Sequence, residues 1–103
     1  MGEWASIQPE RGKFDWEPAE AEYKNQIVSE KLTAVPLLCY TAPWASSGPN
    51  GDKLYPPTDL MDYFRFVKAT AEHFKGRVPA YEIWNEPNGR GVFFAGGCDK
   101  IML

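Results

Sequence analysis

Glu86 is the residue of this chain whose neighbours best suggest chemistry. It lies in the run Glu-Ile-Trp-Asn-Glu-Pro-Asn, with Asn85 before it and Pro87 after it. A carboxylic acid can protonate a glycosidic oxygen, and an amide beside it can hydrogen-bond a sugar hydroxyl. A Glu in this position can also be a surface carboxylate in a turn, and Asn85 can simply cap that turn before the proline. The run therefore leaves a chemical and a structural interpretation open.

The elements that would position these residues alternate along the chain. Strands are expected over residues 2–6, 32–40 and 79–84, helices over 16–31 and 59–74, and the start of a further helix over 99–103. Asp15 and Thr58 are the expected N-caps of the two complete helices. Between them, residues 41–57 are rich in Pro, Gly, Ser and Asn and are expected to form a long loop.

Side-chain spacing predicts which helix faces are buried. The second helix carries an apolar stripe that would face the core, formed by Leu60, Phe64, Val67, Ala71 and Phe74. Glu20 and Lys24 are expected to form an exposed pair four residues apart. We expect His73 to be a solvated helix residue, Arg77 an exposed charge at the helix end, and Trp84 part of the core.

The order strand, helix, strand, helix, strand predicts an α/β protein with a parallel sheet and right-handed crossovers. An open doubly wound sheet and a closed barrel both fit this order. No glycine-rich phosphate loop follows the two better-defined strands, so no nucleotide cofactor is expected, and no metal site is expected either. Ligands of parallel α/β folds bind at the carboxyl ends of the strands. The stretches expected there, 4–8, 40–47 and 85–91, are rich in Trp, Tyr, Asn and Glu, which suits a sugar.

Composition limits the kinds of partner. The 103 residues suffice for one small domain, and 44% hydrophobic and 24% charged residues are ordinary for a folded protein. A net charge of −3 gives no basic excess for nucleic acid, and no apolar run is long enough to span a membrane. No secretory signal begins the chain, and localisation and oligomeric state stay open. Two cysteines, Cys39 and Cys98, are too few for a disulfide framework.

Three segments together resemble a known enzyme class. PAYEIWNEPN is similar to the fourth-strand signature of clan A glycoside hydrolases, WASIQPERGKFDW to the end of the second strand and its loop, and LLCYTAPWAS to the end of the third strand. The similarity is closest to family 39-like and cellulase-like members. It implies that residues 1–103 are an incomplete (β/α)8 barrel, covering strands two to four of a catalytic domain that acts on β-linked polysaccharides or their oligomers.

The resemblance also implies roles for individual residues. Glu86 would be the general acid/base of a retaining mechanism, and Asn85 would bind the hydroxyl next to the reacting carbon. Trp44 would line the substrate cleft, with Trp4 and Asn88 as further binding residues. The nucleophile of the resembled enzymes lies on strand seven, and no residue of this chain matches it.

Two other interpretations remain at this stage. The chain can be a truncated, catalytically inactive piece or a weak carbohydrate-binding module, because three parallel strands cut from a barrel have two open edges. It can also be an unrelated aromatic-rich interaction domain, which would place Trp4, Trp44 and Trp84 together on one exposed patch.

Overall fold

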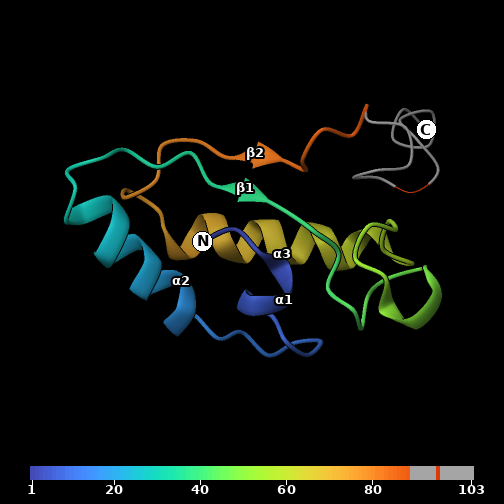
Figure 1. Ribbon diagram of the computed structural model, residues 1–103. Coiled ribbons are helices and arrows are strands. Elements are labelled where there is room, and N and C mark those ends of the chain that lie inside the picture. The colour runs from blue at the N-terminus through green and yellow to red at the C-terminus, as the bar shows by residue number, and fades with distance from the viewer. Residues whose placement is uncertain (89–94, 96–103) are drawn as a thin grey trace.

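The computed structural model describes residues 1–88 and residue 95, and Figure 1 shows how their elements are arranged. In chain order these are α1 (Trp4–Ile7), α2 (Glu17–Glu22), the π-helix η1 (Tyr23–Val28), β1 (Leu37–Leu38), the 3-10 helix η2 (Pro49–Gly51), α3 (Leu60–His73) and β2 (Glu82–Ile83). The helix expected over 99–103 and the second cysteine, Cys98, lie outside the described residues.

The strands pair in parallel, which confirms the orientation predicted from the element order. β1 and β2 align Leu37 with Glu82 and Leu38 with Ile83. On the other edge of β1, Glu3 forms a parallel bridge with Cys39. The close approach there requires a glycine, because a Cβ at Gly2 would lie 2.1 Å from the carbonyl oxygen of Leu37.

Both longer strands are shorter than predicted. Leu32 and Val35 belong to the apolar run that was expected to be a strand buried on both faces, yet they are 61% and 52% exposed. Ile83 in β2 is 58% exposed. No described element covers these side chains, so their apolar character alone does not bury them. The described residues therefore form a small mixed α/β arrangement, which is compatible with an open sheet and with part of a barrel.

The core lies on one face of the strands, where the helices pack. Leu38 is fully buried in a cluster with Trp4 of α1 and Phe66 of α3. Figure 1 shows α1, α2 and α3 on the same side of β1 and β2. The next residue, Cys39, belongs instead to a second small cluster with Trp84. Successive side chains of a strand point to opposite faces, which explains this division. Trp84 is 8% exposed, so its predicted place in the core is confirmed.

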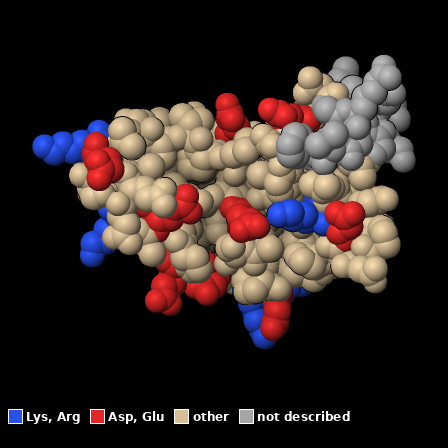
Figure 2. Space-filling model, viewed as in Figure 1, with Lys and Arg blue, Asp and Glu red and all other residues tan. Residues whose placement is uncertain are grey.

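The charged side chains on the face shown in Figure 2 are interspersed rather than gathered into a field of one sign. Several form pairs with near neighbours, such as Lys13 with Glu10 at 2.7 Å and Lys68 with Glu72 at 3.8 Å. Exposed pairs of this kind contribute little to stability.

The first long helix runs over residues 17–28, within the predicted range, and changes from α-helical to π-helical hydrogen bonding at Tyr23. The Asp15 carboxylate accepts a hydrogen bond from the backbone N–H of Glu17 at 3.0 Å, although the N-cap residue itself is Trp16. Pro18 lies in the first turn, where its missing N–H costs nothing. The sequence signals for this helix start were therefore correct to within one residue.

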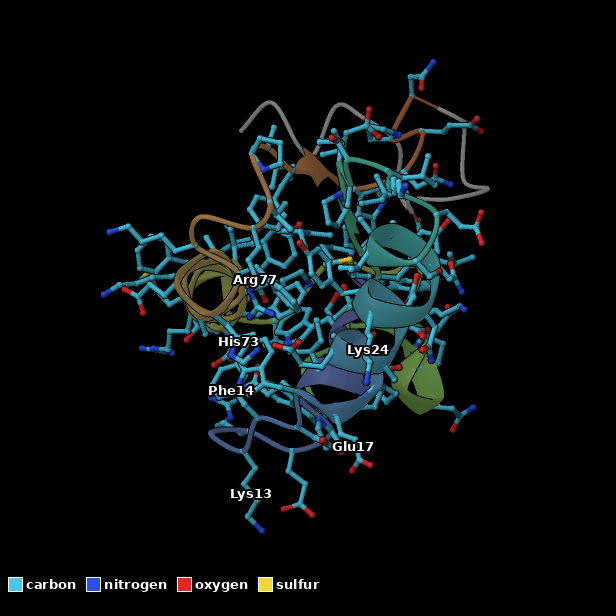
Figure 3. The ribbon with its side chains drawn as sticks, turned by 90° about the vertical axis from the view of Figure 1, so that its left-hand side faces the viewer. Lys13, Phe14, Glu17, Lys24, His73 and Arg77 are labelled. Carbon is cyan, nitrogen blue, oxygen red and sulfur yellow. The ribbon has the colours of Figure 1, made fainter. Side chains whose placement is uncertain are left out.

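The predicted pairing of Glu20 with Lys24 is wrong. Glu20 binds His73 and Arg77 across the helices, with its carboxylate 2.6 Å from His73 Nε2 and 2.8–2.9 Å from the Arg77 guanidinium. The ring of His73 also stacks on Trp16 at a centroid distance of 4.0 Å, so the prediction of a solvated histidine is wrong too. Figure 3 shows Lys24 apart from His73 and Arg77. Tertiary packing of α3 beside α2 offers Glu20 two rigid donors, which a flexible lysine on its own helix does not match.

Arg77 is exposed near the end of α3, as predicted, but it also makes defined contacts with its neighbours. Its guanidinium lies 4.7 Å from the ring centroid of Phe74 and binds Glu20 through two nitrogens. The side chain is only 36% exposed. It therefore joins the end of α3 to α2 through packing as well as charge.

The predicted inward stripe of α3 is only partly correct. Phe74 is fully buried and Val67 packs against the core, as predicted. Leu60 and Phe64 are 71% and 55% exposed, whereas Asp62, Phe66 and Thr70 are buried. Asp62 can occupy a buried position because Arg11, from the turn after α1, lies 3.0 Å from its Oδ2 and Arg65 lies 3.2 Å from its Oδ1. The Thr70 hydroxyl donates to the carbonyl of Phe66. These partners allow a partly polar face to turn inward, which a count of apolar residues does not reveal.

Replacing Glu20 with Gln should destabilise the protein by roughly 1 kcal/mol at neutral pH, because the ion pairs are partly exposed. The Arg77 guanidinium, hydrogen-bonded to the carboxylate, lowers the pKa of Glu20 from 4.5 to about 2. A lowered folded-state pKa contributes stability that is complete above the unfolded pKa and is lost as pH falls through the folded one. Urea unfolding should therefore show the difference between parent and variant shrinking from pH 4.5 to pH 2. The control is Glu72→Gln, and a pH-independent difference for Glu20→Gln would contradict this role.

Asp59, rather than the predicted Thr58, caps α3. Its Oδ1 accepts a hydrogen bond from the backbone N–H of Met61 at 2.9 Å. Asp59→Ala should cost about 1 kcal/mol in the free energy of unfolding, and Thr58→Ala should change it little. Equal losses for the two variants in urea titrations would show that the cap is misassigned.

Candidate functional site

The carboxyl ends of the two strands meet at residues 84–86 and 38–40. The backbone N–H of Trp84 donates to the carbonyl of Leu38 at 3.1 Å, so the pairing continues past β2. Asn85 and Glu86 follow at once, and they leave the sheet where β1 also ends. This is the place at which a parallel sheet presents side chains to a ligand.

A side-chain hydrogen bond joins the two strand ends. Asn85 Nδ2 donates to the hydroxyl of Tyr40 at 2.9 Å, between residues 45 positions apart in the chain. Tyr40 is half-buried, and its ring meets Trp84 edge-on at a centroid distance of 5.4 Å. The ammonium of Lys53 lies 5.4 Å from the same ring centroid. Asn85, Tyr40 and Lys53 thus come together from three separate segments.

The backbone around Asn85 is unusual on both sides. Trp84 has φ = 65° and Glu86 has φ = 42°, in the left-handed region that favours glycine. Conformations of this kind cost about 1–3 kcal/mol each and persist where the surrounding structure holds them. Trp84 is buried, and its packing helps to keep the backbone in this conformation. The Glu86 side chain is exposed and follows directly from this turn, so a ligand can reach its carboxyl group.

The structure places Trp4 away from any surface. It is fully buried, donates from Nε1 to Gln8 Oε1 at 2.8 Å, and stacks on Phe66 at a centroid distance of 5.3 Å. A ring without exposed surface cannot stack on a sugar. In this structure Trp4 is a core residue, which corrects its place among the predicted binding residues.

Trp44 is half-buried and belongs to the same aromatic cluster as Trp4. Its Nε1 donates to the carbonyl of Gln8 at 2.8 Å, and its ring meets Trp4 edge-on at 5.5 Å. The Arg11 guanidinium lies 5.2 Å from the Trp44 ring centroid. These contacts hold Trp44 to the turn after α1, whereas Asn85 is bound to Tyr40. Trp44 and Asn85 therefore belong to separate groups of contacts, and a cleft that includes both remains a prediction.

The remaining predicted binding residue, Asn88, is exposed in the turn that follows Pro87. The alternative of an exposed patch made by Trp4, Trp44 and Trp84 is wrong, because Trp4 and Trp84 are 0% and 8% exposed. Both indole rings pack against core residues of their own clusters.

The sequence patterns assign no individual role to Tyr40, Lys53 or Glu3. All three line an open cavity of about 530 Å3, together with Cys39 at its wall. Burial raises the pKa of the Cys39 thiol, so this cysteine favours the neutral form. The available signal was positional, since Tyr40 ends one predicted strand and Asn85 follows another.

Two classes of site are absent from the described part of the chain. Within residues 1–88 and 95, no three His, Cys, Asp or Glu side chains are grouped as a metal site would need. In the same residues, no helix has the length and apolar character required to cross a membrane. Comparison of the chain with protein-family models, with curated proteins and with solved structures found no match. Its function therefore has to be inferred from its own residues.

Tryptophan fluorescence tests the placement of the indole rings. A variant with Trp16 and Trp44 replaced by Phe keeps only Trp4 and Trp84, both buried. We expect blue-shifted emission and weak quenching by acrylamide, with strong quenching after unfolding in urea as the control. Quenching of the folded variant as strong as in urea would contradict the buried positions.

Proposed function

We propose that this chain is part of a retaining glycoside hydrolase in which Glu86 is the general acid/base. The observation that supports this most is the pair Asn85–Glu86 at the carboxyl end of β2, with Asn85 bound to Tyr40 at the end of the parallel neighbour β1. An exposed carboxylic acid beside a fixed amide suits a sugar whose glycosidic bond is to be cleaved.

In this proposal each residue has a definite task. Glu86 protonates the leaving oxygen, and its carboxylate then takes a proton from the water that completes hydrolysis. Asn85 binds the hydroxyl next to the reacting carbon. The substrates are β-linked polysaccharides or oligosaccharides, as in the enzymes that the sequence resembles, and no cofactor takes part.

A retaining mechanism also needs a nucleophilic carboxylate about 5–5.5 Å from the acid/base. Glu82 does not match that position in the resembled enzymes, whose nucleophile lies on strand seven of a barrel of about 250 residues. The proposal therefore assigns the nucleophile to a later strand of a complete barrel, so that this chain contributes the acid/base half of the site.

The second candidate is a carbohydrate-binding module without catalytic activity. The uncovered apolar side chains favour it, because Val35, before β1, and Ile83, in β2, are more than half exposed and no described element covers them. A sheet in this state can present Asn85 and Tyr40 to a sugar without a second carboxylate beside Glu86.

Glu86→Gln tests the catalytic role in the longest polypeptide that the gene encodes. The kcat/KM of the variant on glycosides with poor leaving groups should be about 10²–10⁴-fold lower than that of the parent. The variant should keep much of its activity on aryl glycosides with good leaving groups, which need little protonation. Asp52→Asn is the matched control, because Asp52 is an exposed carboxylate directly after η2.

Two outcomes would contradict the catalytic proposal. Equal activity of parent and Glu86→Gln on both classes of substrate would remove Glu86 as the acid/base. Oligosaccharide binding without hydrolysis, in a polypeptide with a reading frame that stops at Leu103, would favour the carbohydrate-binding module.

A further inference from the structure

We propose that Tyr40 is a positioning residue that fixes the orientation of Asn85 and, through it, the direction in which Glu86 leaves the sheet. This inference rests on the proposed function, since it names the residue that prepares the same site for a sugar. Its structural part, the control of Asn85 by the Tyr40 hydroxyl, can be tested without any sugar.

The hydrogen bond between Asn85 and Tyr40 uses only the nitrogen end of the Asn85 amide. Asn85 Nδ2 donates to the Tyr40 hydroxyl at 2.9 Å. An amide held through its nitrogen presents its carbonyl oxygen on the other side, where Oδ1 can accept a hydrogen bond. The ligand group that fits is an O–H donor, such as a sugar hydroxyl. Tyr40 thus selects a hydroxyl donor as the partner of Asn85.

Tyr40 can perform this task because its own position is fixed by several contacts. Its ring packs edge-on against Trp84 and lies beneath the Lys53 ammonium, each at 5.4 Å. The next residue, Thr41, donates its N–H to the carbonyl of Lys53 at 3.1 Å and its hydroxyl to the carbonyl of Tyr55 at 2.6 Å. The loop that carries Lys53 is therefore bound to the end of β1, and Tyr40 is held between that loop and β2.

The backbone angles on both sides of Asn85 explain why its side chain needs a fixed partner. Positive φ angles at Trp84 and Glu86 flank Asn85, and both residues have side chains that disfavour them. Without a tether at Asn85, this segment can relax toward ordinary backbone angles, and the Glu86 carboxyl group would then change direction. The Tyr40 hydroxyl provides a side-chain contact that ties Asn85 to the neighbouring strand.

Tyr40→Phe tests the inference, because it removes the hydroxyl and keeps the ring with its contacts to Trp84 and Lys53. The first measurement is the side-chain amide signal of Asn85 in a ¹⁵N–¹H NMR spectrum, assigned by its loss in Asn85→Ala. We expect this signal to shift in Tyr40→Phe and to exchange with solvent faster. Tyr81→Phe is the matched control, since the Tyr81 hydroxyl is directed to the Thr70 carbonyl at 3.5 Å. An unchanged Asn85 signal in Tyr40→Phe would overturn the inference.

The second measurement is a titration with a hexasaccharide of β-linked glucose or xylose. We expect Tyr40→Phe to weaken binding about five- to tenfold, the effect of losing one neutral hydrogen bond, and Tyr81→Phe to leave it unchanged. In an Asn85→Ala background the Tyr40 substitution should have no further effect. Additive losses in this double-mutant cycle would overturn the inference.

The two measurements separate the inference from the proposed function. If the parent chain binds neither hexasaccharide while the Asn85 signal responds to Tyr40→Phe, the sugar-binding proposal fails and the positioning of Asn85 stands. If the parent binds sugar and Tyr40→Phe changes neither the signal nor the affinity, the proposed function stands and the role of Tyr40 is refuted. Should Tyr40→Phe lose its dispersed NMR spectrum, Asn85→Leu removes the same hydrogen bond from the other side, and the ring signals of Tyr40 are then read in place of the amide signal. A shift of these ring signals supports the inference, and unchanged ring signals overturn it.

Discussion

Burial of Leu38 in one cluster with Trp4 and Phe66 is the interaction on which the other features depend. These three residues have no exposed surface, and they join the middle strand to helices on either side of it in sequence. Burying each large apolar side chain contributes about 1.5–3 kcal/mol, so this contact sets the distance and orientation of the helices relative to β1. The positions of the residues at the carboxyl ends of the strands therefore depend on this packing.

The polar interactions of the helix layer follow from that packing. Once α3 lies beside α2, Glu20 meets His73 and Arg77, and the ring of His73 lies flat on Trp16. Asp62 is buried by the same arrangement, with Arg11 beside it. These groups contribute less free energy than the apolar core, because most are partly exposed, but they favour one relative placement of the helices over others.

The two faces of the strands differ in what they carry. Leu38 faces the helices, whereas Cys39, with Leu37 and Tyr40 packed nearby, belongs to the cluster around Trp84. The second face has few covering residues and borders the cavity of about 530 Å3. The two faces therefore have different tasks. The packed face holds the strands in place, while the strand ends and the open face remain accessible to a ligand.

The sequence by itself determined the features that depend on local patterns. These are the parallel alternation of strands and helices, the approximate limits of both long helices, the buried position of Trp84, and the place of Asn85 and Glu86 at the end of a strand. Only the tertiary structure decided which side chains meet over long distances in the chain. It turned a partly polar face of α3 inward, buried Trp4, and gave Asn85 the hydroxyl of Tyr40, 45 positions away. Periodicity and capping act between residues a few positions apart, whereas the partner of a side chain is chosen by packing among segments that the sequence does not place side by side.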